Sequence, residues 1–230
     1  MKKVFLGLIL VLIVGCSKGD SSEGSVKDFD GNVYTPIKIG TQTWYKENLN
    51  VSKYADGTLI PEVNDPEQWS KLTTGAWCYL DDDSSNGENL GKLYNWYAVA
   101  GIYDTNSLIN SSLRKKLAPQ GNHIPSDSEW TTMINSLGSN AGGKMKEIGT
   151  DYWIDTDDNV TNSSFFTGRP CGICIKNGSF YFVGEFGYWW TSTSKDNETS
   201  WNRSLGYNSN VVCRSFDEKN YGFSVRFIKD

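Results

Sequence analysis

Gly187-Tyr188-Trp189-Trp190-Thr191-Ser192-Thr193 decides the fold, because its aromatic and β-branched residues open a series of strand signals separated by turn residues. In the next segment, alternation with a period of two places Trp201, Arg203, Leu205 and Tyr207 on one face. An arginine on such a face is either buried in an ion pair, which we favour, or part of a binding groove. We expect strands at residues 181–183, 188–193, 200–207, 211–216 and 223–228.

Upstream of these strands the chain carries helix signals. Ser126-Asp127-Ser128-Glu129 forms a capping box, and apolar residues follow at helical spacing from Trp130 to Leu137, before Gly138 ends the helix. Nearer the N-terminus, the Asp30-Gly31 turn is followed by strand signals. Helices in the middle and strands at both ends predict an α+β fold. The remaining expected elements are strands at 33–39 and 43–45, helices at 92–100 and 141–148, and a loop at 81–91.

The composition favours a compact, β-rich chain. Nine Trp, twelve Tyr and ten Phe accompany 23 Gly in 230 residues, so aromatic rings either fill the core or line a ligand surface. The formal net charge is −5. This balance argues against nucleic acid and against an anionic membrane surface as partners.

The N-terminus has the pattern of a lipoprotein signal. Lys2 and Lys3 precede an apolar run, residues 4–14, that is too short to span a membrane. Ile13-Val14-Gly15-Cys16 resembles the lipobox of bacterial lipoproteins, which implies cleavage after Gly15 and a lipid on Cys16. We therefore expect a signal peptide at 1–15, a flexible tether at 16–27 and one domain at 28–230. The lipid would be the only membrane anchor and would hold the protein at the outer membrane, on its periplasmic or cell-surface face.

The Cys16→Ser precursor is expected to carry no lipid and to stay uncleaved after Gly15, because serine offers no thiol to alkylate. Metabolic labelling with an alkyne fatty acid measures this, with the wild-type precursor as the control. Label that persists on the serine variant would contradict the lipoprotein interpretation.

Several motifs occur in a fixed order along the chain: DGNVY (30–34), KIGTQTW (38–44), ENL (47–49), GKLYNWYAV (91–99), PSDSEW (125–130), GYWWTST (187–193) and GFSVR (222–226). Together they resemble the Fibrobacter succinogenes major paralogous domain, which is typical of surface lipoproteins in Bacteroidetes-like bacteria. Residues 187–228 also resemble, more distantly, C-type-lectin-like and formylglycine-generating-enzyme-like proteins. That second resemblance implies a C-type-lectin-like α+β fold with small twisted antiparallel sheets and two or three short helices.

Lipidation of Cys16 would leave four cysteines, and an even number in an oxidising envelope predicts disulfides. We expect a local bond between Cys171 and Cys174, with a pairing that involves Cys78 and Cys213 as the alternative. A redox role for the Cys-x-x-Cys motif would need a following helix, which the sequence does not predict. The formylglycine-type resemblance implies a further alternative, copper-dependent oxidation by a cysteine pair in a ligand groove.

Other catalytic and metal-binding patterns are sparse. His123 is the only histidine, so catalysis by a histidine base would depend on it, and we expect it to be packed or hydrogen-bonded instead. Asp82, Ser84 and Asn86 match the first half of a calcium loop, but Leu93 occupies the position of the bidentate glutamate. A second acidic run lies at 155–159. We expect no cofactor, with calcium as the one candidate ion.

The C-type-lectin-like resemblance implies ligand contacts from the C-terminal sheet and its loops. In this chain the corresponding residues combine rings with amides and cations, a mixture that suits sugars or a protein hot spot. We expect a double Asn208→Ala and Asn210→Ala change to weaken binding. The candidates are Trp201, Arg203, Tyr207, Asn208, Asn210, Arg214, Lys219 and Tyr221.

The sequence thus predicts a lipid-anchored, non-catalytic binding module for glycan or protein. The alternatives are a formylglycine-generating-enzyme-like oxidoreductase and a structural subunit of a surface assembly. A buried cysteine pair at a cleft would favour the enzyme, and a long unpaired edge strand would favour the assembly.

Overall fold

The computed structural model describes residues 24–155 and 159–230. The predicted signal peptide, Cys16 and most of the tether lie outside the described residues. At the start of the described part, β1 (Val26–Lys27) pairs antiparallel with β2 (Val33–Tyr34) around the predicted Asp30-Gly31 turn. Strand pairing thus begins at Val26, within the expected tether, and the domain boundary at residue 28 stays a prediction.

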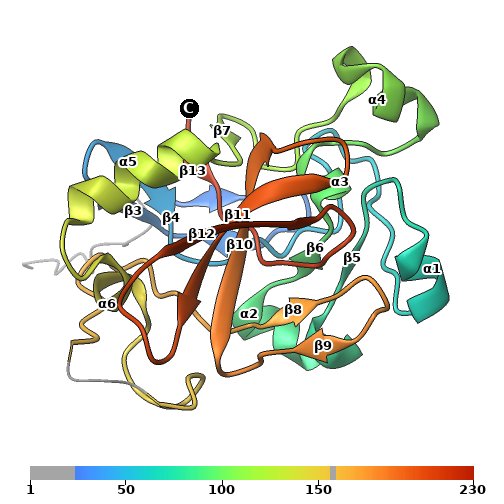
Figure 1. The fold of residues 1–230 in the computed structure, drawn as a ribbon. Helices are drawn as coiled ribbons and strands as arrows, with labels where there is room; N and C mark the ends of the chain where they lie inside the picture. The colour runs from blue at the N-terminus through green and yellow to red at the C-terminus, as the bar shows by residue number, and fades with distance from the viewer. Residues whose placement is uncertain (1–23, 156–158) are drawn as a thin grey trace, which may run out of the picture.

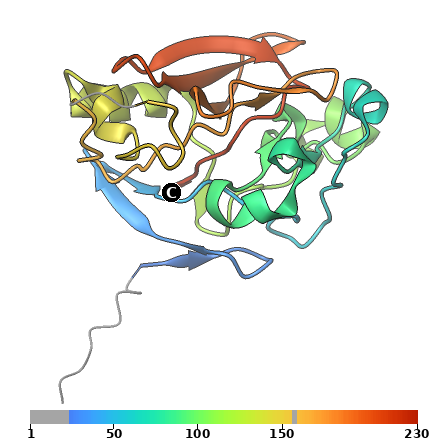
Figure 2. The same cartoon turned by 90° about the horizontal axis from the view of Figure 1, so that it is seen from below.

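The largest strands form a three-stranded antiparallel sheet at the C-terminal end of the chain (Figure 1). Its order is β10 (Phe186–Ser194), β11 (Thr199–Gly206) and β12 (Cys213–Glu218), which confirms three of the predicted strands. Seen from below, this sheet covers one side of the molecule, and the N-terminal hairpin lies on the opposite side (Figure 2).

Smaller sheets make up the rest of the β structure. A four-stranded sheet has the order β3 (Pro36–Ile39), β4 (Gln42–Tyr45), β13 (Ile228–Lys229) and β7 (Asn122–His123). Two further pairs are β5 (Trp77–Cys78) with β6 (Leu93–Tyr94) and β8 (Ile173–Cys174) with β9 (Phe180–Tyr181). The short β8–β9 hairpin lies beside the end of β10, where Gly172 bridges to Gly187 (Figure 1).

Six α-helices occur in the described residues, more than the two or three predicted. They are α1 (Pro66–Ser70), α2 (Gly87–Leu90), α3 (Trp96–Val99), α4 (Thr105–Ile109), α5 (Asp127–Leu137) and α6 (Ala141–Met145), with 3-10 turns at Leu80–Asp82, Ser84–Asn86 and Ser111–Leu113.

The longest helix, α5, begins and ends where its sequence predicts. The Ser126 amide donates to Glu129 Oε2 at 2.7 Å, and the Glu129 amide donates to Ser126 Oγ at 3.3 Å, which completes the capping box. Gly138 ends the helix at φ 67°, a value that favours glycine. The apolar face buries Trp130 and Met133 completely.

Three local predictions are wrong. The expected helix at 92–100 is divided: Asn95 caps the short helix α3 through the Ala98 amide, so Leu93 and Tyr94 remain in strand β6. The expected loop at 81–91 instead contains two 3-10 turns and α2. Only Ile228 of the strand expected at 223–228 joins the β13 ladder, because residues 222–224 cross the interior and bridge singly to Cys174, Tyr94 and Trp189.

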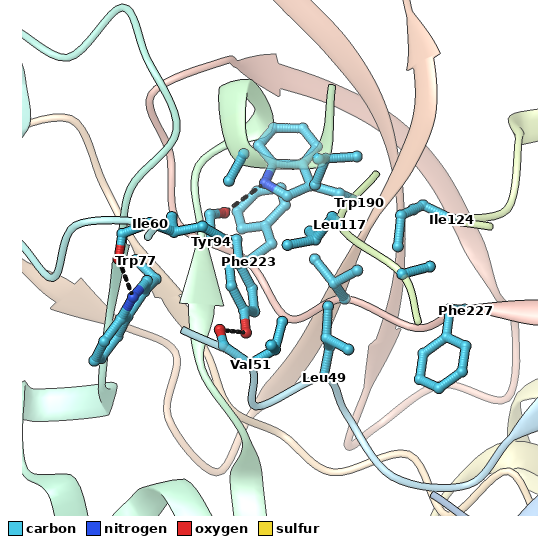
Figure 3. Close-up of a cluster of buried hydrophobic side chains, with 14 of the residues drawn as sticks. Leu49, Val51, Ile60, Trp77, Tyr94, Leu117, Ile124, Trp190, Phe223 and Phe227 are labelled. Carbon is cyan, nitrogen blue, oxygen red and sulfur yellow. Dashed lines mark hydrogen bonds between the residues drawn. The ribbon is translucent and has the colours of Figure 1, made fainter. Parts of the chain in front are cut away.

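The β10 strand separates two aromatic cores. Trp189 and Trp190 are adjacent residues of β10, so their side chains point to opposite faces of the sheet. Both are completely buried. Trp189 packs with α5 and Leu205 in one cluster. Trp190 packs on Phe223 in the other, where its indole N–H donates to the Tyr94 carbonyl at 2.9 Å (Figure 3). Mixed short helices and antiparallel sheets around these cores confirm the α+β class.

Candidate functional site

A groove of about 540 Å³ runs between the C-terminal sheet and the β8–β9 hairpin. The sheet contributes hydroxyl, carboxyl and phenol groups, and the hairpin contributes apolar and aromatic side chains. The combination of ring faces with a few polar groups is typical of small-ligand sites. The lining residues are Ile173, Ile175, Tyr181, Phe182, Tyr188, Ser204, Ser215, Asp217, Tyr221 and Phe223.

Strand register explains why these sheet residues share one face. Tyr188 is paired with Ser204, and Ser204 with Cys213, so residues two positions further along β12 also point toward the groove. Ser215 and Asp217 take those positions. The intervening residues Arg214 and Phe216 point to the other face.

Aromatic rings form a continuous series along the groove. The ring centroid of Phe182 is 5.6 Å from that of Phe186, and the Phe186 centroid is 5.9 Å from that of Tyr188. Tyr188 in turn stacks on Phe223 at 5.2 Å with an interplanar angle of 24°. Tyr181 and Phe182 are exposed at the mouth, at 47% and 44%. Exposed rings of this kind can stack on a ligand without first having to break core contacts.

Phe182 is held in an unusual backbone conformation. Its φ of 62° lies in the left-handed region that non-glycine residues seldom adopt. Its carbonyl accepts the amides of Glu185 and Phe186 at 3.1 and 3.0 Å, so a closed turn holds it there. Such strain is common at ligand-binding positions.

Asp217 is the only carboxylate among the described groove residues. Burial raises its pKa, although a 2.8 Å hydrogen bond from Asn202 Nδ2 acts in the opposite direction. Burial also raises the pKa of Tyr188 to about 12, and the Asp217 charge adds to that shift. The Asn202 Oδ1 and Ser200 Oγ atoms beneath Asp217 have no hydrogen-bond partner within residues 24–155 and 159–230. Ser200 and Asn202 are completely buried, so the hydrogen-bonding groups of the polar wall are those of the lining residues Ser204, Ser215 and Asp217.

Four of the residues expected to bind ligand do not line the groove, because they lie on the opposite face of the sheet or directly after β11. They are Trp201, Arg203, Tyr207 and Arg214. Arg203 is 4% exposed and contacts Asp127 Oδ1 at 2.7 Å, which confirms the favoured interpretation of an ion pair. Arg214 lies over Trp201, with its guanidinium carbon 3.4 Å from the centroid of the Trp201 ring. Tyr207 packs against the cluster that contains Trp189.

The other four expected residues are also dispersed. Lys219 is buried, and its ammonium donates to the carbonyls of Asp196 and Asn197. The Asn210 carbonyl accepts the Gly142 amide, while Asn208 is exposed after β11. Only Tyr221 lines the groove. The predicted residues do not form one site. Successive side chains of a strand point to opposite faces of the sheet, and other predicted residues lie in the loops after the strands.

Sequence reasoning missed most of the groove residues. Alternation within 213–218 could have placed Ser215 and Asp217 together, opposite Arg214 and Phe216. Nothing in the sequence indicated that the β8–β9 hairpin would face them, since that contact joins segments distant along the chain.

The structure confirms the prediction that His123 is hydrogen-bonded. His123 contacts Asp230 Oδ1 through Nδ1 at 2.7 Å and Glu129 Oε1 through Nε2 at 2.9 Å. Burial alone would lower the pKa of His123, but these hydrogen bonds outweigh it and the pKa is raised. The imidazole thus links β7 to the start of α5 and to the C-terminus.

The calcium candidates do not converge. Asn86 donates its amide to the Leu80 carbonyl at 2.9 Å, and Asp82 is exposed with a φ of 54°. Within the described ranges, no three His, Cys, Asp or Glu side chains are grouped closely enough to hold a metal ion. Residues 156–158 of the second acidic run lie outside the described part of the chain.

All four described cysteines, Cys171 and Cys174 among them, are free thiols in this structure, so the expected Cys171–Cys174 bond stays a prediction. Cys171 and Cys174 contact different neighbours, because Gly172 has a φ of 62° and turns the chain between them. Cys171 contacts the Leu90 carbonyl and the Asn48 amide, at 3.7 and 3.5 Å. Cys213 is exposed on β12.

A second cavity, of about 360 Å³, is lined by the buried Arg226. Its Nε donates to Asn48 Oδ1 at 2.6 Å, and Nη1 donates to the Tyr45 and Phe166 carbonyls at 2.9 Å each. Burial lowers the pKa of Arg226 to about 9. Because protein oxygens already satisfy this guanidinium, we assign it to the support of the fold.

These features define an α+β domain in which a C-terminal sheet and a facing hairpin enclose an aromatic groove. The chain belongs to the Fibrobacter succinogenes major domain family, whose model matches residues 37–229. This confirms the family expected from the ordered motifs. No curated protein and no solved structure matches the chain, so the likeness to C-type lectins stays a prediction. In the residues the structure describes, no helix is long and apolar enough to cross a membrane.

Proposed function

We propose that this protein is a lipid-anchored binding module of the bacterial outer membrane, and that the aromatic groove recognises glycan. The observation that carries the proposal is the pairing of exposed rings with a polar sheet wall. Tyr181 and Phe182 offer flat apolar faces at the groove mouth, while Ser215 and Asp217 offer hydrogen-bonding groups across from them. Sugar rings present the matching combination of an apolar face and peripheral hydroxyls.

Charge supports a neutral or hydroxyl-rich ligand over an anionic one. The single groove carboxylate, Asp217, has no cationic partner among the described groove residues. It can accept hydrogen bonds from ligand hydroxyls, and such bonds to a charged acceptor are stronger than neutral ones. An anionic ligand would meet repulsion from the same group.

Two observations weigh against the alternatives. An oxidoreductase of the formylglycine-generating type would need its cysteine pair in the groove, but no cysteine is among the residues that line it. A structural subunit would use an unpaired strand edge, and β12 is such an edge of its sheet. However, β12 carries the charged residues Arg214, Asp217 and Glu218, which oppose edge-to-edge pairing.

The Tyr181→Ala variant is expected to bind a glycan ligand about tenfold more weakly, because hot-spot rings commonly contribute more than 1 kcal/mol to binding. Its melting temperature should change little, since the side chain is 47% exposed. A glycan array identifies the ligand for the wild-type domain, and calorimetry then compares the variants.

Phe216→Ala is the matched control, because Phe216 is 45% exposed but lies on the opposite face of β12. We expect it, and Asn208→Ala, to retain wild-type affinity. Loss of binding in these controls with full affinity in Tyr181→Ala would place the site on the face first expected from sequence.

A further inference from the structure

Two thiols from distant parts of the chain meet in the interior. Cys78 lies on β5 and Cys174 on β8, and each is 1% exposed within one buried cluster. Contact with the Cys174 thiol, together with burial, raises the pKa of the Cys78 thiol well above its ordinary value. The Cys78 sulfur is therefore a poor nucleophile in the folded state, which suits a structural role better than a catalytic one.

Each of the other described cysteines lacks a thiol partner of this kind. Cys171 is directed toward Asn48 and the Leu90 carbonyl. Cys213 is on the exposed edge strand, paired in register with Ser204. Cys171 shares the buried cluster, but among the described cysteines the two thiols that interact with each other are those of Cys78 and Cys174.

We propose that Cys78 and Cys174 form a disulfide in the mature protein, an inference that rests on the envelope location proposed above. The bond would form during folding, while both thiols are still accessible. One thiolate attacks the disulfide of an oxidant and displaces a thiolate, and the second cysteine then attacks the mixed disulfide. The two cysteines lose two protons and two electrons, and the oxidant's disulfide is reduced to two thiols.

The bond would connect β5 to β8 beside the groove. Cys174 lies between Ile173 and Ile175, which both line the groove wall on the β8 side. A link to β5 would fix that wall, and it would close a loop of roughly 100 residues, the length range in which a crosslink most restricts the unfolded chain. The same bond would remove a buried thiol pair that an oxidising compartment would otherwise leave reactive during folding.

Peptide mapping under non-reducing conditions tests the proposal on the full-length protein. One sample is extracted from cell envelopes after thiol alkylation, and a second is reduced, unfolded and refolded in a glutathione redox buffer. We expect a linked peptide pair containing Cys78 and Cys174 in both samples. Because Cys171 and Cys174 lie close in sequence, a Cys171→Ala variant identifies the sulfur: the link should survive in it and disappear in Cys174→Ala.

Oxidation should also raise the urea midpoint of the wild type, and reductant should abolish this shift. Free Cys78 and Cys174 in both samples, or a Cys171–Cys174 link, would overturn the pairing. A link that forms on refolding but is missing from cell envelopes would overturn the disulfide in cells and the proposed location together. Glycan binding is measured independently of these samples, so its failure would leave the pairing standing.

Discussion

Trp130→Ala is expected to reduce the free energy of unfolding by about 3–5 kcal/mol, the range for complete truncation of a buried aromatic side chain. Trp130 is 0% exposed and lies at the centre of an aromatic cluster. Its ring centroid is 4.8 Å from that of Trp44, 5.7 Å from Phe166 and 6.4 Å from Trp189. Removal of the indole would leave a cavity between α5 and the sheet that these large rings cannot easily fill.

Urea denaturation measures the effect, with two comparison variants. Ser126→Ala removes only the helix cap and should cost about 1 kcal/mol. Trp130→Phe should cost clearly less than the alanine variant, because the indole N–H has no hydrogen-bond partner among the described residues and its loss leaves no acceptor unpaired. A Trp130→Ala protein as stable as wild type would show that α5 does not pack on the core.

Arg226→Met is expected to destabilise the fold by about 3–5 kcal/mol, because several buried oxygens would lose their donor at about 1–3 kcal/mol for each unsatisfied group. The guanidinium donates to the Asn48 side chain and to the carbonyls of Tyr45, Phe166 and Thr167. Methionine fills similar space but donates nothing, so these buried oxygens would lose their partner, and each unsatisfied group is costly.

Arg226→Lys separates charge from geometry. Lysine keeps the positive charge but cannot span acceptors on two segments, 45–48 and 166–167, with one ammonium group, so the stability of this variant should lie between those of wild type and Arg226→Met. Thermal melts of the three proteins provide the measurement. Equal stability of all three would mean that water replaces the guanidinium at these carbonyls.

Local sequence patterns predicted the elements whose geometry depends on neighbours in the chain. The capping box and apolar spacing located α5 to the residue, because both signals act within one or two helical turns. Turn residues and alternation located β10, β11 and β12 for the same reason. The 92–100 segment was mispredicted where Asn95, whose side chain also accepts the Ala76 amide, made a long-range contact that local spacing does not reveal.

The sequence by itself determined the family, the α+β class and the placement of α5 and the C-terminal sheet, since ordered motifs and short-range periodicity carry that information. Only the tertiary structure decided which side chains meet. The groove lies between β12 and a hairpin that precedes β10. The Cys78 thiol interacts with the thiol of Cys174, which is distant in sequence. Arg226 donates to the carbonyls of Tyr45 and Phe166. Such contacts depend on how separate segments pack, and side-chain alternation within one segment does not specify its partner across the core.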